Sequence, residues 1–150
     1  MRVFSYDIIV DERILMSIIH QTEIGEIVVD NTFFAEKIAA VIMQIHWKGK
    51  FIPATQKGKP LWEDGKFSID DFADTIEIIQ DEKGFTLTVP VIAEFGLPLK
   101  INSEQLIKAI FEEFGELSIP LIKVNIHLVG VKSRLVAKRD IYFSAEKDEI

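Results

Sequence analysis

The segment 85–95, FTLTVPVIAEF, constrains the fold more than any other part of this sequence. Its residues alternate, so one face of an extended strand carries the apolar side chains Phe85, Leu87, Val89, Val91, Ala93 and Phe95. The opposite face carries two threonines, Pro90, Ile92 and Glu94. A strand with one continuous apolar face needs a second layer of structure against it. Pro90 has no N–H to donate to a neighbouring strand, so it predicts a sheet edge or a bulge at this point.

Two segments with helical periodicity supply that second layer. Residues 32–47 and 103–114 each place apolar side chains at the spacing of one helix face. Asn102 is expected to cap the second helix, with Gln105 completing a capping box. Together with an alternating strand at 121–131, the two stripes predict a nearly fully buried core made of Phe34, Ile38, Ile42, Leu106, Ile110, Phe111, Val124 and Ile126.

The order of these signals predicts the fold class. Between residues 25 and 131 the order is strand, helix, strand, strand, helix, strand, with a Gly- and Pro-containing loop at 48–66. Two such halves build an antiparallel sheet with both helices on one face, which is the split βαβ or ferredoxin-like plan. We therefore predict an α+β protein with that sheet, followed by one more strand within 132–143.

The chain is predicted to be a single α+β domain over residues 1–150. Its first part, 1–22, is an N-terminal extension for which two interpretations stay open. After a strand in MRVFSYDIIV, Asp11 caps a helix in one interpretation and opens a second β-rich segment in the other. The last residues, 144–150, are predicted to be a frayed acidic tail.

Composition excludes several classes of protein. The net charge of −7 argues against sequence-independent binding to nucleic acid. The sequence has no cysteine, which removes thiol catalysis and disulfides and fits a reducing compartment. The apolar runs are far shorter than the roughly 20 residues of a membrane span, and the acidic start does not resemble a secretion signal. The expected location is the cytoplasm.

The three histidines do not predict a metal site. His20, His46 and His127 fall in three different predicted elements, without the spacing that brings two imidazoles to one metal. His46 is expected to end a helix, where the negative end of the helix dipole favours a partly charged imidazole. His127 is expected to share a polar sheet face with Lys123 and Asn125.

The densest group of carboxylates lies between residues 63 and 74 and consists of Glu63, Asp64, Asp70, Asp71 and Asp74. Paired carboxylates bind Mg²⁺ or Ca²⁺ or act as acid and base. No calcium-loop pattern is present, so helix capping and solvation explain this group better. The stretch KGKFIPATQKGKP lacks the Gly-Lys-Ser/Thr ending of a phosphate loop, and no nucleophile elbow occurs. No catalytic, cofactor-binding or metal-binding residue is predicted.

A basic cluster near the C-terminus is the predicted partner-binding site. Lys132, Arg134, Lys138 and Arg139 fall within eight residues of an otherwise acidic chain. Such a cluster docks an anionic partner or an anionic membrane leaflet, and the alternative is a solvated strand face. We expect the C-terminal strand to act in a homo-oligomer or with an anchor protein, and we expect no direct membrane span.

Two stretches resemble the alkaline shock protein family of Gram-positive bacteria over residues 24–131. The first is GEIVVDNTFFAEKIAAVI, a Gly-led strand that runs into a helix rich in Ile and Ala. The second is FTLTVPVIAEFG followed by a helix and IPLIKVNIHLVGV, in which the matching residues are Phe95, Gly96, Val124, Ile126, Leu128, Gly130 and Val131. The sequence HWKGKFIP after the first helix departs from the family pattern. The resemblance implies a non-enzymatic cytoplasmic protein of cell-envelope homeostasis, with members tethered by an anchor protein.

Three functions therefore remain in competition. The preferred one is a non-catalytic cytoplasmic interaction protein. The family resemblance implies that it acts in cell-envelope stress or homeostasis. The second is a small-molecule-sensing regulatory domain, which rests on analogy with other split βαβ domains. The third is a metal-dependent enzyme that uses the carboxylates of residues 63–74.

Overall fold

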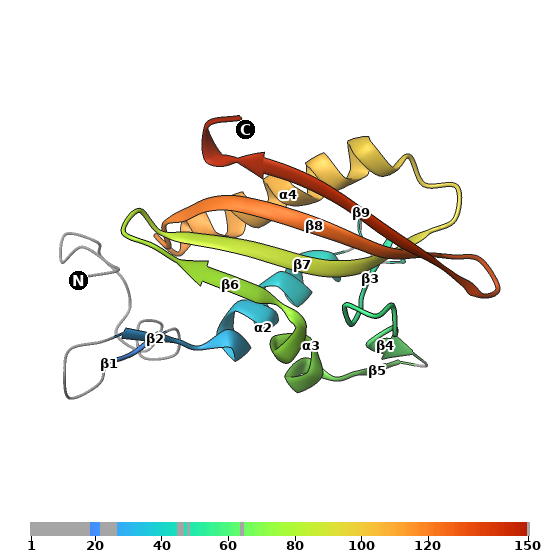
Figure 1. The fold of residues 1–150 in the computed structure, drawn as a ribbon, viewed down its shortest axis with the longest axis horizontal. Coiled ribbons are helices and arrows are strands. Elements are labelled where there is room, and N and C mark those ends of the chain that lie inside the picture. The colour runs from blue at the N-terminus through green and yellow to red at the C-terminus, as the bar shows by residue number, and fades with distance from the viewer. Residues whose placement is uncertain (1–18, 22–26, 45–46, 48, 64, 150) are drawn as a thin grey trace.

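The fold is described here from a computed structural model, which describes residues 19–21, 27–44, 47, 49–63 and 65–149 (Figure 1). The predicted strand of residues 1–10 and the helix or strand that follows Asp11 lie outside these residues. Only Ile19–Gln21 is described there, as strand β1, and it pairs antiparallel with β2, Ile27–Val29. The strand predicted at 25–29 is confirmed for its last three residues, but it pairs with β1 and not with the main sheet.

The main sheet has five strands around β7, Phe85–Glu94. On one side β7 pairs in parallel with β8, Leu121–Lys132, which pairs antiparallel with β9, Val136–Glu146. On its other side β7 pairs antiparallel with β6, Glu77–Gln80, and with β3, Phe51–Pro53. The sheet is therefore mixed, so the prediction of an antiparallel sheet was wrong. The ferredoxin-like plan is not confirmed, and the coarser α+β class is.

Pro90 marks a gap in the sheet and not a sheet edge. On the side of β6 and β3, the β7 ladder pairs residues 85–88 with β6 and residues 91–93 with β3. The interruption falls at Val89 and Pro90, where only the Pro90 carbonyl accepts a bond, from the Ala54 N–H at 3.2 Å. The N–H and C=O of one residue point to the same side of a strand, so the N–H that Pro90 lacks would point into this gap. The prediction that Pro90 interrupts pairing is confirmed.

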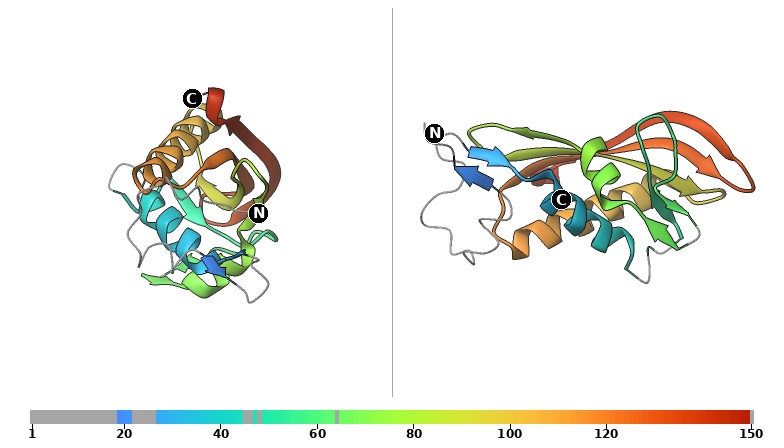
Figure 2. Two further views of the ribbon diagram at one scale, coloured as in Figure 1. Left: turned by 90° about the vertical axis from the view of Figure 1, so that its left-hand side faces the viewer. Right: turned by 90° about the horizontal axis from the view of Figure 1, so that it is seen from below.

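Two helices cover the same face of this sheet (Figure 2). They are α2, Asn31–Ile42, and α4, Leu99–Glu116, and their buried residues join the apolar face of β7 and β8 in one core. Phe34 of α2 lies against Phe85 of β7, with ring centroids 5.2 Å apart, and stacks on Phe114 of α4 at 5.3 Å. The placement of both helices on one face is confirmed.

Seven of the eight predicted core residues are fully buried, and Phe111 is not. Phe111 is only partly buried at the rim of the core, whereas Phe114 is completely buried. The two residues lie three positions apart on α4, so both are near the apolar stripe, but Phe114 points to its centre. The prediction that Phe111 is a core residue was therefore wrong.

Element boundaries differ from prediction in three further places. The helix α2 ends at Ile42, five residues before its predicted end at 47. The helix α4 begins at Leu99, so Asn102 is not its N-cap, and its side-chain amide donates to the Pro98 carbonyl at 2.7 Å. Of the predicted tail 144–150, residues 144–146 continue β9, and Lys147–Glu149 form a 3₁₀ turn, η1.

The predicted loop 48–66 and the acidic segment after it contain unpredicted structure. Besides β3, the loop holds a small hairpin of β4, Trp62–Glu63, and β5, Lys66–Phe67. The segment that follows is a short helix, α3, Ile69–Thr75, which buries Phe72 and Ala73 against the core.

We expect Phe114→Ala to lower the free energy of unfolding by about 3–5 kcal/mol, because it removes a completely buried ring that stacks on Phe34. Phe111→Ala should cost less than half as much, because that ring is partly exposed. Urea unfolding of both variants measures the difference. Equal losses would show that the two rings are buried alike.

We expect Gly84→Ala to lower the free energy of unfolding by more than about 2 kcal/mol. Gly84 has φ +148°, and an added Cβ would lie 2.1 Å from the Pro120 carbonyl oxygen, which already accepts the Phe85 N–H at 2.8 Å. The matched control is Gly115→Ala in α4, where nothing lies within 4 Å of an added Cβ. That change should be neutral or stabilising by up to about 1 kcal/mol. Similar thermal melting of the two variants would contradict this assignment.

Candidate partner-binding surface

The four predicted basic residues lie together at one end of the β8–β9 hairpin, which projects past the end of β7 (Figure 1). Lys132 is the last residue of β8, Arg134 lies in the turn, and Lys138 and Arg139 lie in β9. Gly130 is opposite Lys138 and Lys132 is opposite Val136, so Lys132 and Lys138 share one face of the hairpin. We call residues 132–139 the basic hairpin end.

The charged groups of the basic hairpin end face solvent. Arg134, Lys138 and Arg139 are exposed, and Lys132 is half-buried. Within the part of the chain that the structure describes, none of the four forms an ion pair. Arg139 donates one hydrogen bond, to the neighbouring Lys138 carbonyl at 2.8 Å. Their positive charge is therefore not neutralised by a salt bridge with a described carboxylate.

Two large apolar side chains are exposed beside these charges. Leu135, in the hairpin turn, is 82% exposed, and Phe95 is 73% exposed. The Phe95 N–H donates to the Lys132 carbonyl at 2.9 Å, which holds Phe95 next to the hairpin. Sequence reasoning assigned Phe95 to the apolar face of a strand, but β7 ends at Glu94 and the chain turns away at Gly96, φ +86°.

A shallow depression of ≈ 360 Å³ lies between this hairpin and the ends of β3 and β7. Residues from all three elements line it, and they are Gly49, Ile52, Glu94, Phe95, Lys132 and Ser133. The surface thus combines positive charge, an exposed aromatic ring and a hollow. It suits a partner that offers acidic groups around an apolar side chain.

The base of the hairpin is fixed by a second, small apolar core on the face away from α2 and α4. Ala54, Ile92 and Val129 are buried in it, and Ile52 and Val136 pack against them. Gly130 allows this packing, because a Cβ there would lie 2.6 Å from Val136 Cγ1 and 3.4 Å from Ile92 Cγ1. The turn at residues 55–59 approaches the same place, since a Cβ on Gly58 would lie 3.5 Å from the Val129 carbonyl.

His127 lies on the polar sheet face with Lys123 and Asn125, as predicted. Its Nε2 is 2.7 Å from Asp140 Oδ1, and its ring stacks on that of Tyr142 with centroids 4.2 Å apart. The Asn125 amide donates to Thr88 Oγ1 at 3.0 Å. The side chains of His20 and His46 lie outside the described residues. Among the residues that are described, no three His, Cys, Asp or Glu side chains come together as a metal site.

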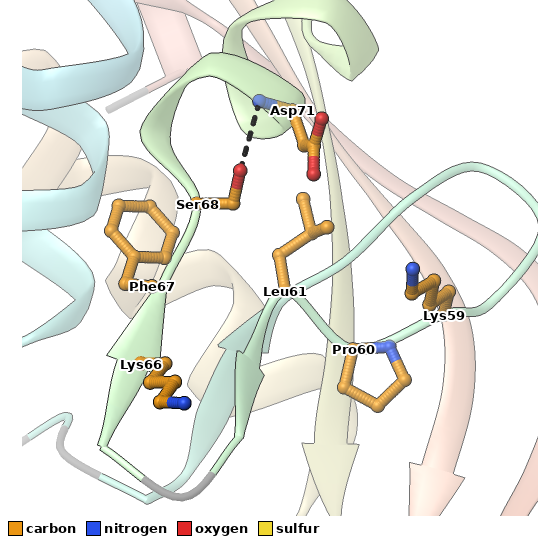
Figure 3. Close-up of a pocket in the computed structure, with 7 residues that line it drawn as sticks. All are labelled: Lys59, Pro60, Leu61, Lys66, Phe67, Ser68 and Asp71. Atoms are coloured by element: carbon orange, nitrogen blue, oxygen red, sulfur yellow. Dashed lines mark hydrogen bonds between the residues drawn. The ribbon is translucent and has the colours of Figure 1, made fainter.

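The 63–74 carboxylates are divided between two elements. Asp70, Asp71 and Asp74 lie in α3, Glu63 is the last residue of β4, and Asp64 lies outside the described residues. Ser68 caps this helix, accepting the Asp71 N–H at 3.4 Å, and Asp70 and Asp71 lie in the first turn, where acids are favoured. A depression of ≈ 390 Å³ beside it is lined by Lys59, Pro60, Leu61, Lys66, Phe67, Ser68 and Asp71 (Figure 3). It presents one carboxylate with two lysines, so it does not pair acids as a magnesium site or an acid–base pair requires.

No described helix is both long enough and apolar enough to cross a membrane. Of the surfaces above, the basic hairpin end is the one that combines several exposed basic side chains with exposed apolar ones. No family model, no curated protein and no solved structure shows significant similarity to this chain.

Proposed function

We propose that this chain is a non-catalytic, cytoplasmic interaction protein that binds an acidic protein partner through the basic hairpin end. The observation that carries the proposal is the position of Lys132, Arg134, Lys138 and Arg139. All four lie on one projecting hairpin of a chain whose net charge is −7. An acidic partner is repelled by most of such a surface and attracted at this end, which orients it as it approaches.

The exposed apolar side chains add contact area to this attraction. Leu135 and Phe95 are each more than 70% exposed. An aromatic ring that becomes buried at an interface contributes more to affinity than a rim charge does. In this proposal the basic side chains steer the partner, and Phe95 and Leu135 supply the contact that loses water on binding.

The biological setting of this proposal rests on sequence resemblance. If residues 24–131 belong with the alkaline shock proteins, the partner is an anchor protein or an enzyme of envelope homeostasis. A small-molecule sensor and a metal-dependent enzyme are the two alternatives from the sequence. No observation on the described residues favours either of them over a protein partner.

We expect the double variant Arg134→Glu/Arg139→Glu to bind acidic protein surfaces about ten-fold more weakly than the parent. Two rim charges worth about 0.5–1 kcal/mol each correspond to a change of that size. The measurement is fluorescence anisotropy with a labelled octaglutamate peptide at low and high salt, with a pull-down from the native cell beside it. High salt should weaken the parent in the same way, because exposed charges are screened.

The matched control is Lys57→Glu/Lys59→Glu, which changes the net charge equally at exposed positions outside the hairpin. This control should keep most of the parent affinity. Equal loss in both double variants would show that net charge alone acts. Unchanged binding and unchanged partner recovery in Arg134→Glu/Arg139→Glu would rule the surface out. Binding to phosphatidylserine vesicles without binding to the peptide or to any protein would instead indicate a lipid surface.

A further inference from the structure

The two edges of the main sheet are protected very differently. One edge is formed by β3 and β6, which have three and four residues and are separated by the gap at Pro90. The other edge is β9, a strand of 11 residues. No other described strand pairs with its outer side. Short strands and prolines keep an edge from adding a further strand, whereas a long edge leaves backbone N–H and C=O groups free to pair. The β8–β9 ladder has one irregularity, between Leu128 and Gly130, and on β9 the Lys138 carbonyl accepts from the Arg139 side chain and the Glu146 N–H donates to Glu149.

Part of β9 has no side chain that protects this edge. The stretch Ile141-Tyr142-Phe143-Ser144-Ala145 has neither a charge nor a proline. Tyr142 is 57% exposed and Ile141 is 37% exposed. The charges of β9 flank this stretch, with Lys138, Arg139 and Asp140 on the side of the turn and Glu146 on the other side. Edge strands that stay unpaired usually carry charges or proline along their length.

The order of charges along β9 is self-complementary in one register. Consider two copies of β9 related by a two-fold axis normal to the sheet. Residues opposite each other in the two strands must then point to the same face of the sheet. The axis therefore passes between a residue of one copy and the same residue of the other. An axis at Asp140 sets two aspartates against each other, and an axis at Phe143 sets Asp140 against Glu146. An axis at Ile141 forms no charge pair. An axis at Tyr142 sets Lys138 opposite Glu146, twice.

The register at Tyr142 also matches the apolar residues. It places Ile141 opposite Phe143 on the face that α2 and α4 cover, again twice. On the other face it brings together the two Tyr142 rings, each already stacked on its own His127. Cross-strand pairs of aromatic, β-branched and oppositely charged residues each stabilise a sheet. One register therefore satisfies the charges and the apolar side chains together.

We propose that β9 pairs antiparallel with β9 of a second copy of this chain, in the register centred on Tyr142. The two five-stranded sheets then become one continuous sheet with the helices of both copies on the same side. The charge pairs of this contact use Lys138 and Glu146, whereas Arg139 lies opposite Ala145 and forms no charge pair, and Arg134 lies in the turn outside β9. Its failure is therefore distinguishable from failure of the acidic-partner proposal, which is tested at those two arginines.

Disulfide trapping tests the register directly, because the chain has no cysteine of its own. In the proposed pair the two Tyr142 Cα atoms lie about 4.5–5.5 Å apart, within the range that a disulfide spans. Tyr142→Cys should therefore give a covalent dimer under mild oxidation. The matched control is Ser144→Cys, an exposed position on the same face. Its two copies would lie about 14 Å apart, since four residues of strand separate them, and should stay monomeric on a non-reducing gel.

A charge swap tests the same register without touching the tyrosine. Lys138→Glu and Glu146→Lys should each weaken the dimer about ten-fold in sedimentation equilibrium, because each creates two like-charge pairs. The double variant Lys138→Glu/Glu146→Lys should restore the parent dissociation constant, and thermal melting checks that all variants fold. A parent that stays monomeric to roughly 100 μM would falsify the proposal, since weak interfaces associate in the micromolar range. A dimer without the Tyr142→Cys link, or without rescue in the double variant, would overturn this register.

Discussion

The contact of three phenylalanine rings holds the layers of this protein together. Phe34 lies between Phe85 and Phe114, so one residue of α2 contacts both the central strand and α4. All three are completely buried, and aromatic rings at these distances attract beyond the area they remove from water. The position of α4 in turn fixes β8, because α4 is the connection between the parallel strands β7 and β8. The hairpin that carries the basic residues thus depends on a contact at the opposite end of β8.

Periodicity was a reliable guide where a segment is long and has one apolar face. The alternation in 85–95 indicated the central strand, and the stripes at 32–47 and 103–114 indicated α2 and α4 and their buried residues Phe34, Ile38, Ile42, Leu106 and Ile110. It was less reliable at the ends. Pro98 is the N-cap residue of α4 and makes no side-chain cap hydrogen bond, so the capping pattern at Asn102 predicted the start of this helix too late in the sequence. The helix α3 was missed because seven residues contribute only Phe72 and Ala73 to the core.

Topology was the part that periodicity could not supply. An alternating strand has the same pattern whether its neighbour runs parallel or antiparallel. Two neighbouring strands that are connected through a helix run parallel. The sequence, however, does not say which strands are neighbours. Only part of the candidate surface could be predicted, because its other part depends on where strands end and which strands are neighbours. The basic residues are visible as a cluster in the sequence, whereas the exposure of Phe95 follows from where β7 ends, and the contribution of Gly130 follows from side chains that are remote in sequence.

The connection through α4 also bears on how the chain reaches its fold. The strands β8 and β9 are joined by a turn of three residues, so their pairing closes a very short loop. Pairing of β7 with β8 must first bring together residues on either side of segment 95–120, which costs more chain entropy. We therefore expect the C-terminal hairpin to form before the central parallel pair, so that amide protection in pulse-labelled hydrogen exchange rises first in residues 121–146. During synthesis residues 121–146 leave the ribosome after β7 and α4, so the element expected to form first in refolding is made later than the strand and helix that it joins.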